Sequence, residues 1–128
     1  MRLLLDTHAL LWWLDGDHQL PVTAQAAISE SGNQAIVSAA SAWEIATKVR
    51  IGRLPGAIEV ADRFSEILTE QQFAALPIAA EHARRAGLLP GEHRDPFDRM
   101  LIAQSQIEGL ILVSNESLFD RFGIERLW

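Results

Sequence analysis

The stretch Leu110-Ile111-Leu112-Val113-Ser114-Asn115-Glu116 decides the fold of this chain. Its first four residues are all apolar, and polar residues follow them at once. A short apolar run of this kind is typical of a strand buried on both faces, as in a parallel sheet. The segment before it, Pro96 to Glu108, has the proline start and the Gly109 stop of a helix. A helix that leads directly into a buried strand predicts an α/β fold.

The remaining segments continue this alternation in both directions along the chain. We expect strands at 2–5, 35–37 and 73–77, which are short and mostly apolar, and a last strand at 125–127. Strands that alternate with helices predict a mostly parallel sheet. The expected helices are 8–14, 23–31 capped by Thr23, 39–51 closed by Gly52, 57–70, 79–86 ended by Gly87, and a short turn at 118–121.

Length and composition narrow the class of protein. The chain has 128 residues, which predicts one domain over 1–128 with a core large enough to fold without disulfides. The absence of cysteine excludes a disulfide scaffold, a cysteine-ligated zinc site and a cysteine nucleophile. No apolar run is long enough to cross a membrane. We therefore expect a cytoplasmic protein without a membrane partner.

The net charge of −6 bears on possible partners. Proteins that bind nucleic acid are usually basic, because lysine and arginine contact the phosphates. Taken alone, the acidic balance argues against such a partner. A divalent cation held by several carboxylates would reverse the local charge and remove this objection.

Four acids occupy positions where such a cation could bind. Asp6 directly follows one predicted strand, and Glu116 follows another after two residues. Parallel strands bind ligands beyond their carboxyl ends, so these two acids are expected at one edge of the sheet. Asp98 begins a third element and Glu44 lies near the start of a fourth. Four converging carboxylates would suit Mg²⁺ or Mn²⁺, which prefer oxygen ligands.

Each acid also has a purely structural interpretation. Asp6 is in position to cap the first helix, and Asp95 to cap the helix that starts at Pro96. Glu44 completes the pattern Ser41-Ala-Trp-Glu, which matches a capping box. Glu116 could be a solvated turn residue. Spacing alone leaves both interpretations open.

Four segments, taken together, resemble the PIN-domain family and within it the VapC ribonuclease toxins of toxin–antitoxin pairs. The segments occur in the family's order and span essentially the whole chain, with Trp128 as a common ending. They read Leu-Leu-Leu-Asp6-Thr7-His8-Ala-Leu-Leu-Trp12, Ser38-Ala-Ala-Ser41-Ala-Trp43-Glu44-Ile45-Ala-Thr-Lys48, His93-Arg94-Asp95-Pro96-Phe97-Asp98-Arg99-Met100-Leu101-Ile102-Ala103 and Leu112-Val113-Ser114-Asn115-Glu116.

The resemblance implies a three-layer α/β/α sandwich and Mg²⁺- or Mn²⁺-dependent endoribonuclease activity. It assigns the metal and the catalysis to Asp6, Glu44, Asp98 and Glu116, with Asp95 as an accessory. The fourth position is usually aspartate in the family, and Glu116 departs from that pattern. Ser114 matches a small hydroxyl residue that often lies at the site. A cognate antitoxin and a homodimer are implied as partners.

Several other side chains have two interpretations each. Arg99 could contact a phosphate or pair with a buried acid. Lys48, with Arg50 and Arg53, could hold phosphates or only favour the end of its helix. His8 could approach RNA, although a packed or surface role is more common for such a residue. The tryptophans Trp12, Trp13 and Trp43 could stack on bases or belong to a core or an interface.

Apolar surface offers candidates for the antitoxin groove. The segment Leu10 to Leu14 and the helix around Phe64 and Leu68 are rich in large apolar residues. Exposed surface of this kind usually marks an interface. The alternative is that both segments are core.

Two other functions compete with the ribonuclease. A non-catalytic PIN-like module that binds RNA or serves as a scaffold is favoured by the Glu116 departure. A phosphatase acting through the same acids is less favoured, because the chain has no glycine-rich loop to cradle a phosphate. Binding of a divalent metal discriminates between the ribonuclease and the non-catalytic module.

Overall fold

A computed structural model describes residues 1–91 and 93–128. Its centre is a five-stranded sheet in the order β3-β2-β1-β4-β5, and every strand pair in it is parallel. The predicted mostly parallel sheet is thus confirmed. The strands are β1 (Arg2–Leu5), β2 (Gln34–Ser38), β3 (Ala74–Leu76), β4 (Ile111–Val113) and β5 (Arg126–Leu127).

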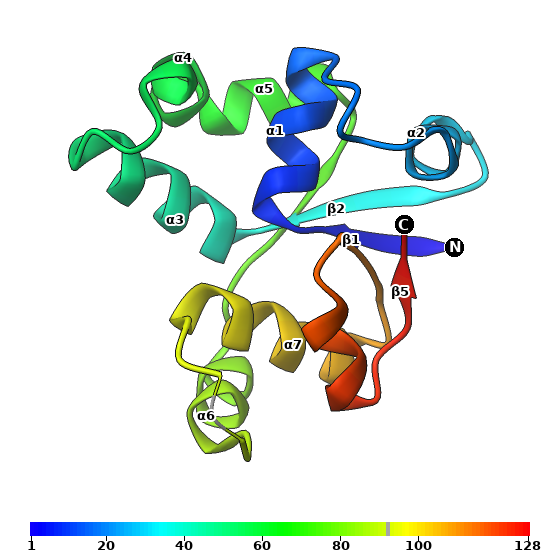
Figure 1. The fold of residues 1–128 in the computed structure, drawn as a ribbon, viewed down its shortest axis with the longest axis vertical. Helices are drawn as coiled ribbons and strands as arrows, with labels where there is room; N and C mark the ends of the chain where they lie inside the picture. The colour runs from blue at the N-terminus through cyan, green and yellow to red at the C-terminus, as the bar shows by residue number, and fades with distance from the viewer. Residues whose placement is uncertain (92) are drawn as a thin grey trace.

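Helices cover both faces of the sheet, which gives the three layers expected of an α/β/α sandwich (Figure 1). One face carries α1 (Thr7–Asp15), α2 (Val22–Ser29), α3 (Ala39–Arg50), α4 (Ile58–Asp62) and α5 (Phe64–Glu70). The other face carries α6 (Ala80–Leu88), α7 (Pro96–Glu108) and the 3-10 helix η2 (Ser117–Phe122). A further 3-10 helix, η1 (Pro55–Ala57), leads into α4.

The core is divided by the sheet because successive strand side chains point to opposite faces. Leu3 and Leu5 of β1 pack in the cluster under α1 and α2, whereas Leu4 packs with Leu101 and Ile102 of α7. All three leucines of β1 are fully buried. This burial on both faces explains why the strands read as continuous apolar runs.

Helices α1 and α7 each begin at an acidic N-cap residue. The side chain of Asp6 accepts a hydrogen bond from the backbone N–H of Ala9 at the start of α1. Asp95 accepts hydrogen bonds from the backbone of Phe97 and Asp98 at the start of α7. Helix α7 ends at Gly109 in the left-handed region, as predicted. These two acids therefore have fixed positions relative to the sheet.

Three predicted helix boundaries are wrong. Helix α2 begins at Val22 after Pro21, so Thr23 lies inside the helix and does not cap it. Helix α6 passes through Gly87 and ends at Leu88. Leu89 precedes a proline and is extended, which explains the later stop.

The third error is the single helix predicted over 57–70. The chain leaves helical geometry at Arg63, which has φ −120° and ψ 30°, so η1, α4 and α5 replace one long helix. Val60 and Phe64 still pack on the same core as Leu68. The apolar periodicity therefore continues through the break and gives no sign of it.

Among the helices of residues 1–91 and 93–128, none combines the length and the apolar character that a membrane span requires.

Candidate metal and active site

A pocket of about 380 Å³ lies beyond the carboxyl ends of the central strands β1 and β4. The strand order reverses between these two strands, which is where α/β sheets usually bind ligands. Five carboxylates and one lysine are among its lining residues. The lining comprises Asp6, Thr7, His8, Trp12, Gln19, Glu44, Lys48, Asp95, Asp98, Asn115, Glu116 and Phe119.

Asp6 is one of two buried acids in the pocket and is 8% exposed. Its backbone N–H donates to the carbonyl of Val113, which joins the end of β1 to the end of β4. Burial raises the pKa of the Asp6 carboxyl, and hydrogen bonds from Ser114 and from the Ala9 backbone partly oppose that rise. Capping and pocket lining thus coexist in one side chain, so the cap interpretation does not remove Asp6 from the site.

Glu44 reaches the pocket from α3 and is 5% exposed. The Thr7 hydroxyl donates to its Oε1 at 2.5 Å, and Lys48 Nζ lies 2.5 Å from its Oε2. The capping-box interpretation of Ser41 and Glu44 is wrong, because Ser38 is the N-cap of α3. Ser41 Oγ instead lies 3.1 Å from the Thr7 hydroxyl oxygen, and because the one Thr7 proton goes to Glu44, the Ser41 hydroxyl is the donor in this pair. Both oxygens of Glu44 are therefore held by defined partners.

Asp98 is the acid whose ionisation is most affected by the others. Its pKa is raised to about 7, first by burial and then by the negative charges of Asp95, Glu44, Asp6 and Glu116. Repulsion from all four acids requires that the carboxylates lie near one another. The acids that were predicted to converge thus act on one another electrostatically in the structure.

Glu116 lies at the rim of the pocket and is exposed. Its carboxylate caps η2 by accepting a hydrogen bond from Leu118 N–H at 3.2 Å. Ser114, which is fully buried, accepts a hydrogen bond from the Glu116 backbone N–H. Ser114 therefore links Asp6 to the chain segment that presents Glu116.

Within 1–91 and 93–128, the side chains as they stand form no group of three acids or histidines that could hold a metal ion. The buried carboxylates are occupied by their own partners, namely Ala9 N–H for Asp6 and Thr7 with Lys48 for Glu44. The lining nevertheless offers the ligand atoms that a hard divalent cation prefers, namely several carboxylate oxygens and no sulfur. By the chemistry of their side chains, the lining residues therefore fit such an ion.

Arg99 does not line the pocket. Its guanidinium donates to the backbone carbonyls of Ala86, His93, Gly87 and Leu89. These bonds tie the connection between α6 and α7 to α7 itself. Among residues 1–91 and 93–128, no acid pairs with Arg99 and the pocket lining does not include it, so its observed role is to hold the segment that precedes Asp95.

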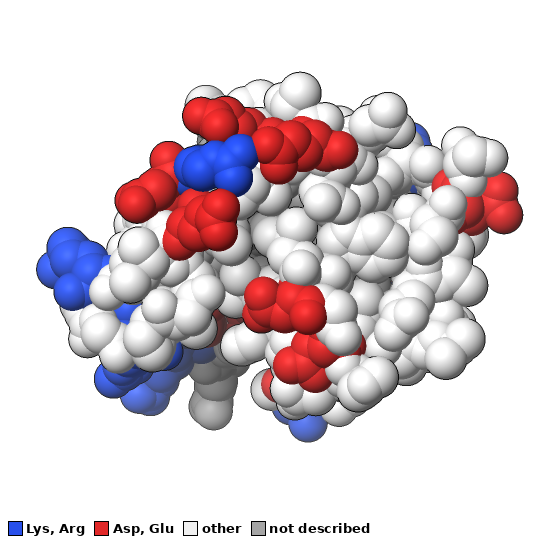
Figure 2. Space-filling model, turned by 90° about the horizontal axis from the view of Figure 1, so that it is seen from above, with Lys and Arg blue, Asp and Glu red and all other residues white. Residues whose placement is uncertain are grey.

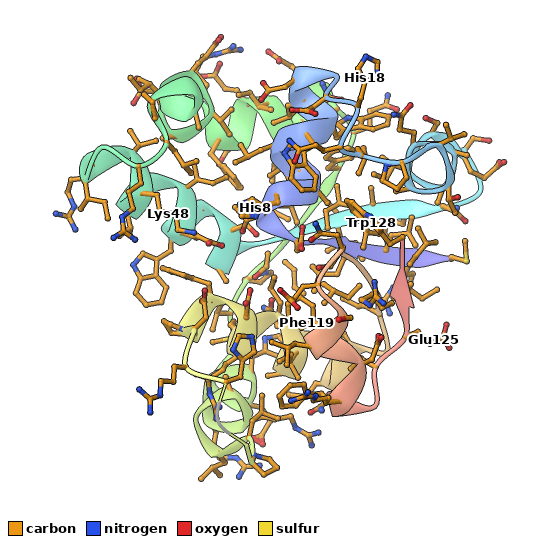
Figure 3. All side chains as sticks on the ribbon, viewed as in Figure 1. His8, His18, Lys48, Phe119, Glu125 and Trp128 are labelled. Carbon is orange, nitrogen blue, oxygen red and sulfur yellow. The ribbon has the colours of Figure 1, made fainter. Side chains whose placement is uncertain are left out.

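Aromatic and basic side chains border the acids. His8 is exposed and stacks obliquely on Trp12, with ring centroids 5.6 Å apart. Figure 3 shows His8 on α1 and Lys48 on α3 on one side of the site, with Phe119 on the other. Trp43 is 57% exposed and packs edge-on against Phe97 at 4.7 Å, so it is not a core residue. Trp12 and Trp13 are partly buried against the core.

Sequence reasoning gave no site role to Thr7, Gln19, Asn115, Phe119 or His93. Thr7 binds a residue 37 positions away, and no spacing rule indicates such a contact. The only available signal was its place directly after Asp6 at a strand end. A larger hollow of about 850 Å³ lies at the opposite end of the sheet, but Glu30 is the only acid that lines it.

Comparisons with known proteins agree with this architecture. The family model described as the PIN domain matches residues 3–125. The chain is similar to the crystal structure of VapBC2 from Rickettsia felis bound to a DNA fragment from their promoter, with a TM-score of 0.66, 15% identity and 100% of both chains covered. It is also similar to VapBC-1 from nontypeable Haemophilus influenzae, with a TM-score of 0.65, 14% identity, and 98% and 96% of the two chains covered. No curated protein matches the sequence.

Proposed function

The chain belongs to the PIN-domain family, and from this premise we propose that it is a divalent-metal-dependent endoribonuclease, the toxin of a toxin–antitoxin pair. The observation that supports the proposal is the raised pKa of Asp98. That rise comes first from burial and then from the charges of Asp95, Glu44, Asp6 and Glu116, and all five carboxylates line one pocket. Such a cluster is costly in a folded protein unless a cation compensates it.

Asp6, Glu44 and Asp98 would hold the ion, with Glu116 at the rim and Asp95 as an accessory. A bound Mg²⁺ or Mn²⁺ supplies a Lewis acid for the scissile phosphate and lowers the pKa of water. Asp6 is oriented for this role by Ala9 N–H, and Glu44 by the Thr7 hydroxyl. When no metal is bound, Lys48 balances the charge of Glu44.

The same cluster explains how an acidic protein would select RNA only in the presence of metal. Without a cation, the carboxylates repel a phosphodiester from the pocket. Basic side chains lie nearby at the end of α3, where Arg50 and Arg53 are exposed. Figure 2 shows basic side chains along the left edge of the face in view and a group of acidic side chains above them. We place the RNA backbone along this edge, leading from the pocket past Lys48.

The partners proposed are an antitoxin and a second copy of the chain. The two solved structures named above carry the name VapBC, and one was solved with promoter DNA. Leu10 and Leu68 are buried, which restricts the antitoxin surface to the partly buried residues around them. The rest of the segment, Leu11 to Leu14, is partly buried, as is Phe64, and these residues remain candidates.

A cleavage assay on total RNA with end mapping tests the proposal. We expect cleavage with Mg²⁺ or Mn²⁺ that leaves 5′-phosphate ends, and none with a chelator. Asp6→Asn should abolish cleavage with the fold intact. Asp120→Asn is the matched control, because Asp120 is an exposed acid paired with Arg126 outside the pocket. Cleavage by Asp6→Asn at the wild-type rate would refute the proposed active site; RNA binding without cleavage would favour the non-catalytic module.

A further inference from the structure

His93 is a buried polar group that the proposed mechanism does not use. Its ring precedes α7 and is 16% exposed. The Nε2 atom is buried and makes no hydrogen bond with any other described residue. An unpaired buried nitrogen is costly, so a native structure usually has a reason for it.

The neighbour of this nitrogen is Asp98. Nε2 lies 3.1 Å from Asp98 Oδ2, which is hydrogen-bond distance, although the angle is poor. A small rotation of the Asp98 carboxylate would complete the bond. Within the described part of the chain, His93 is the one basic side chain within ion-pair distance of this carboxylate. Asp6 and Glu44, by contrast, already have hydrogen-bond donors.

The ring of His93 is held in place from several sides. Its centroid lies 6.3 Å from that of Phe119 and 6.4 Å from that of Phe122. The His93 carbonyl accepts a hydrogen bond from Arg99 Nη1 at 3.0 Å. Arg99 also donates to the Leu89 carbonyl at 2.7 Å, so one side chain of α7 holds both His93 and the residue that follows α6. Nε2 therefore has a fixed direction, toward Asp98.

We propose that His93 is a positioning residue, whose Nε2–H holds Oδ2 of Asp98 and leaves Oδ1 free for the divalent ion. The inference rests on the proposed function. Carboxylates that bind metals are commonly oriented by a hydrogen bond from a second residue, and loss of that residue weakens metal binding 10- to 100-fold as an order of magnitude. The bond needs only the Nε2–H tautomer, so the role does not depend on a charged imidazole.

The test is calorimetric titration of the metal-free protein with Mn²⁺ at one fixed pH. Asp98→Asn first identifies the binding event that belongs to the pocket. His93→Phe keeps an aromatic ring between Phe119 and Phe122 but removes the donor, and we expect Mn²⁺ affinity to fall about 10- to 100-fold. His93→Gln keeps an N–H of similar reach and should bind Mn²⁺ more tightly than His93→Phe. His18→Phe, an exposed histidine outside the pocket, is the matched control and should bind as the wild type does.

Each outcome of the titrations either supports or overturns the role proposed for His93. A folded His93→Phe protein with wild-type Mn²⁺ affinity would overturn the proposal. If His93→Phe does not fold, His93→Gln and His93→Asn replace it, because the asparagine amide is one methylene too short. Weaker binding by His93→Asn than by His93→Gln supports the proposal, and equal affinities overturn it. Absence of Mn²⁺ binding by the wild type would refute the proposed function itself and this role with it.

Discussion

Replacing Asp98 by asparagine should stabilise the metal-free protein at neutral and higher pH. The pKa of the Asp98 carboxyl is raised from 3.8 to about 7 by burial and by repulsion from Asp95, Glu44, Asp6 and Glu116. A pKa difference of this size, at about 1.4 kcal/mol for each unit, corresponds to about 4 kcal/mol. The side chain is 27% exposed, so solvent screening lowers the expected effect to about 2–4 kcal/mol.

The direction of the pH dependence follows from the sign of this difference. A carboxyl with a raised pKa in the folded state binds its proton more tightly there than in the unfolded chain. Stability of the metal-free protein therefore falls as pH rises from about 4 to about 7, and the loss is complete above pH 7. Asparagine carries no charge, so Asp98→Asn lacks this contribution. The variant should equal the wild type at pH 4 and exceed it at pH 8.

Urea unfolding in the presence of a chelator, at pH 4, 6 and 8, measures the effect. The quantity of interest is the difference in free energy of unfolding between Asp98→Asn and the wild type at each pH. Asp120→Asn serves as the control, because pairing with Arg126 lowers the pKa of the Asp120 carboxyl, and its neutralisation should not stabilise the protein at pH 8. A difference for Asp98→Asn that is zero or negative at pH 8 would show that burial and the neighbouring acids do not raise the pKa of Asp98 in the folded protein.

Three further predictions concern single side chains. Thr7→Val removes the donor to the buried Glu44 carboxylate and should lower the free energy of unfolding by about 1–3 kcal/mol in urea titrations; no change would mean that the bond is not formed. Glu116→Gln should slow RNA cleavage less than Asp6→Asn does, because Glu116 is an exposed rim residue; equal losses would make it a direct ligand. Trp13→Asp should reduce co-purification with the neighbouring gene's product, and unchanged recovery by a folded variant would place the antitoxin elsewhere.

The parts of this structure that depend on local pattern could be predicted from the sequence. Apolar runs located β1, β2, β3 and β4, because strands of a parallel sheet that is covered on both faces are mostly apolar. The edge strand β5, Arg126–Leu127, is partly buried and is not an apolar run. Helix α7 was predicted with its observed ends, since Asp95, Pro96 and Gly109 are local signals for a start and a stop. The placement of Asp6 and Glu116 at one pocket followed from the rule that parallel strands end at one edge, whereas Asp98 was expected only from its place at the start of a helix.

The parts that depend on distant partners could not be predicted in this way. The hydrogen bonds of Thr7 with Ser41 and Glu44 join segments more than 30 residues apart, and the cap of α3 is Ser38 although Ser41 also fits the pattern. Arg99 lies beside Asp98 in sequence, yet four backbone carbonyls accept its hydrogen bonds. Choices among competing partners are made by the tertiary structure, and sequence spacing does not record them.

A crystal of the protein soaked in Mn²⁺ tests the central claim most directly, because anomalous scattering locates the ion without reference to activity. The account predicts one or more anomalous peaks inside the pocket, within coordination distance of Asp6 and Asp98 carboxylate oxygens. It also predicts that Glu44 turns from Lys48 toward the ion. A pocket that stays empty at millimolar Mn²⁺, or an ion bound only elsewhere on the molecule, would contradict the claim that these acids form a metal site.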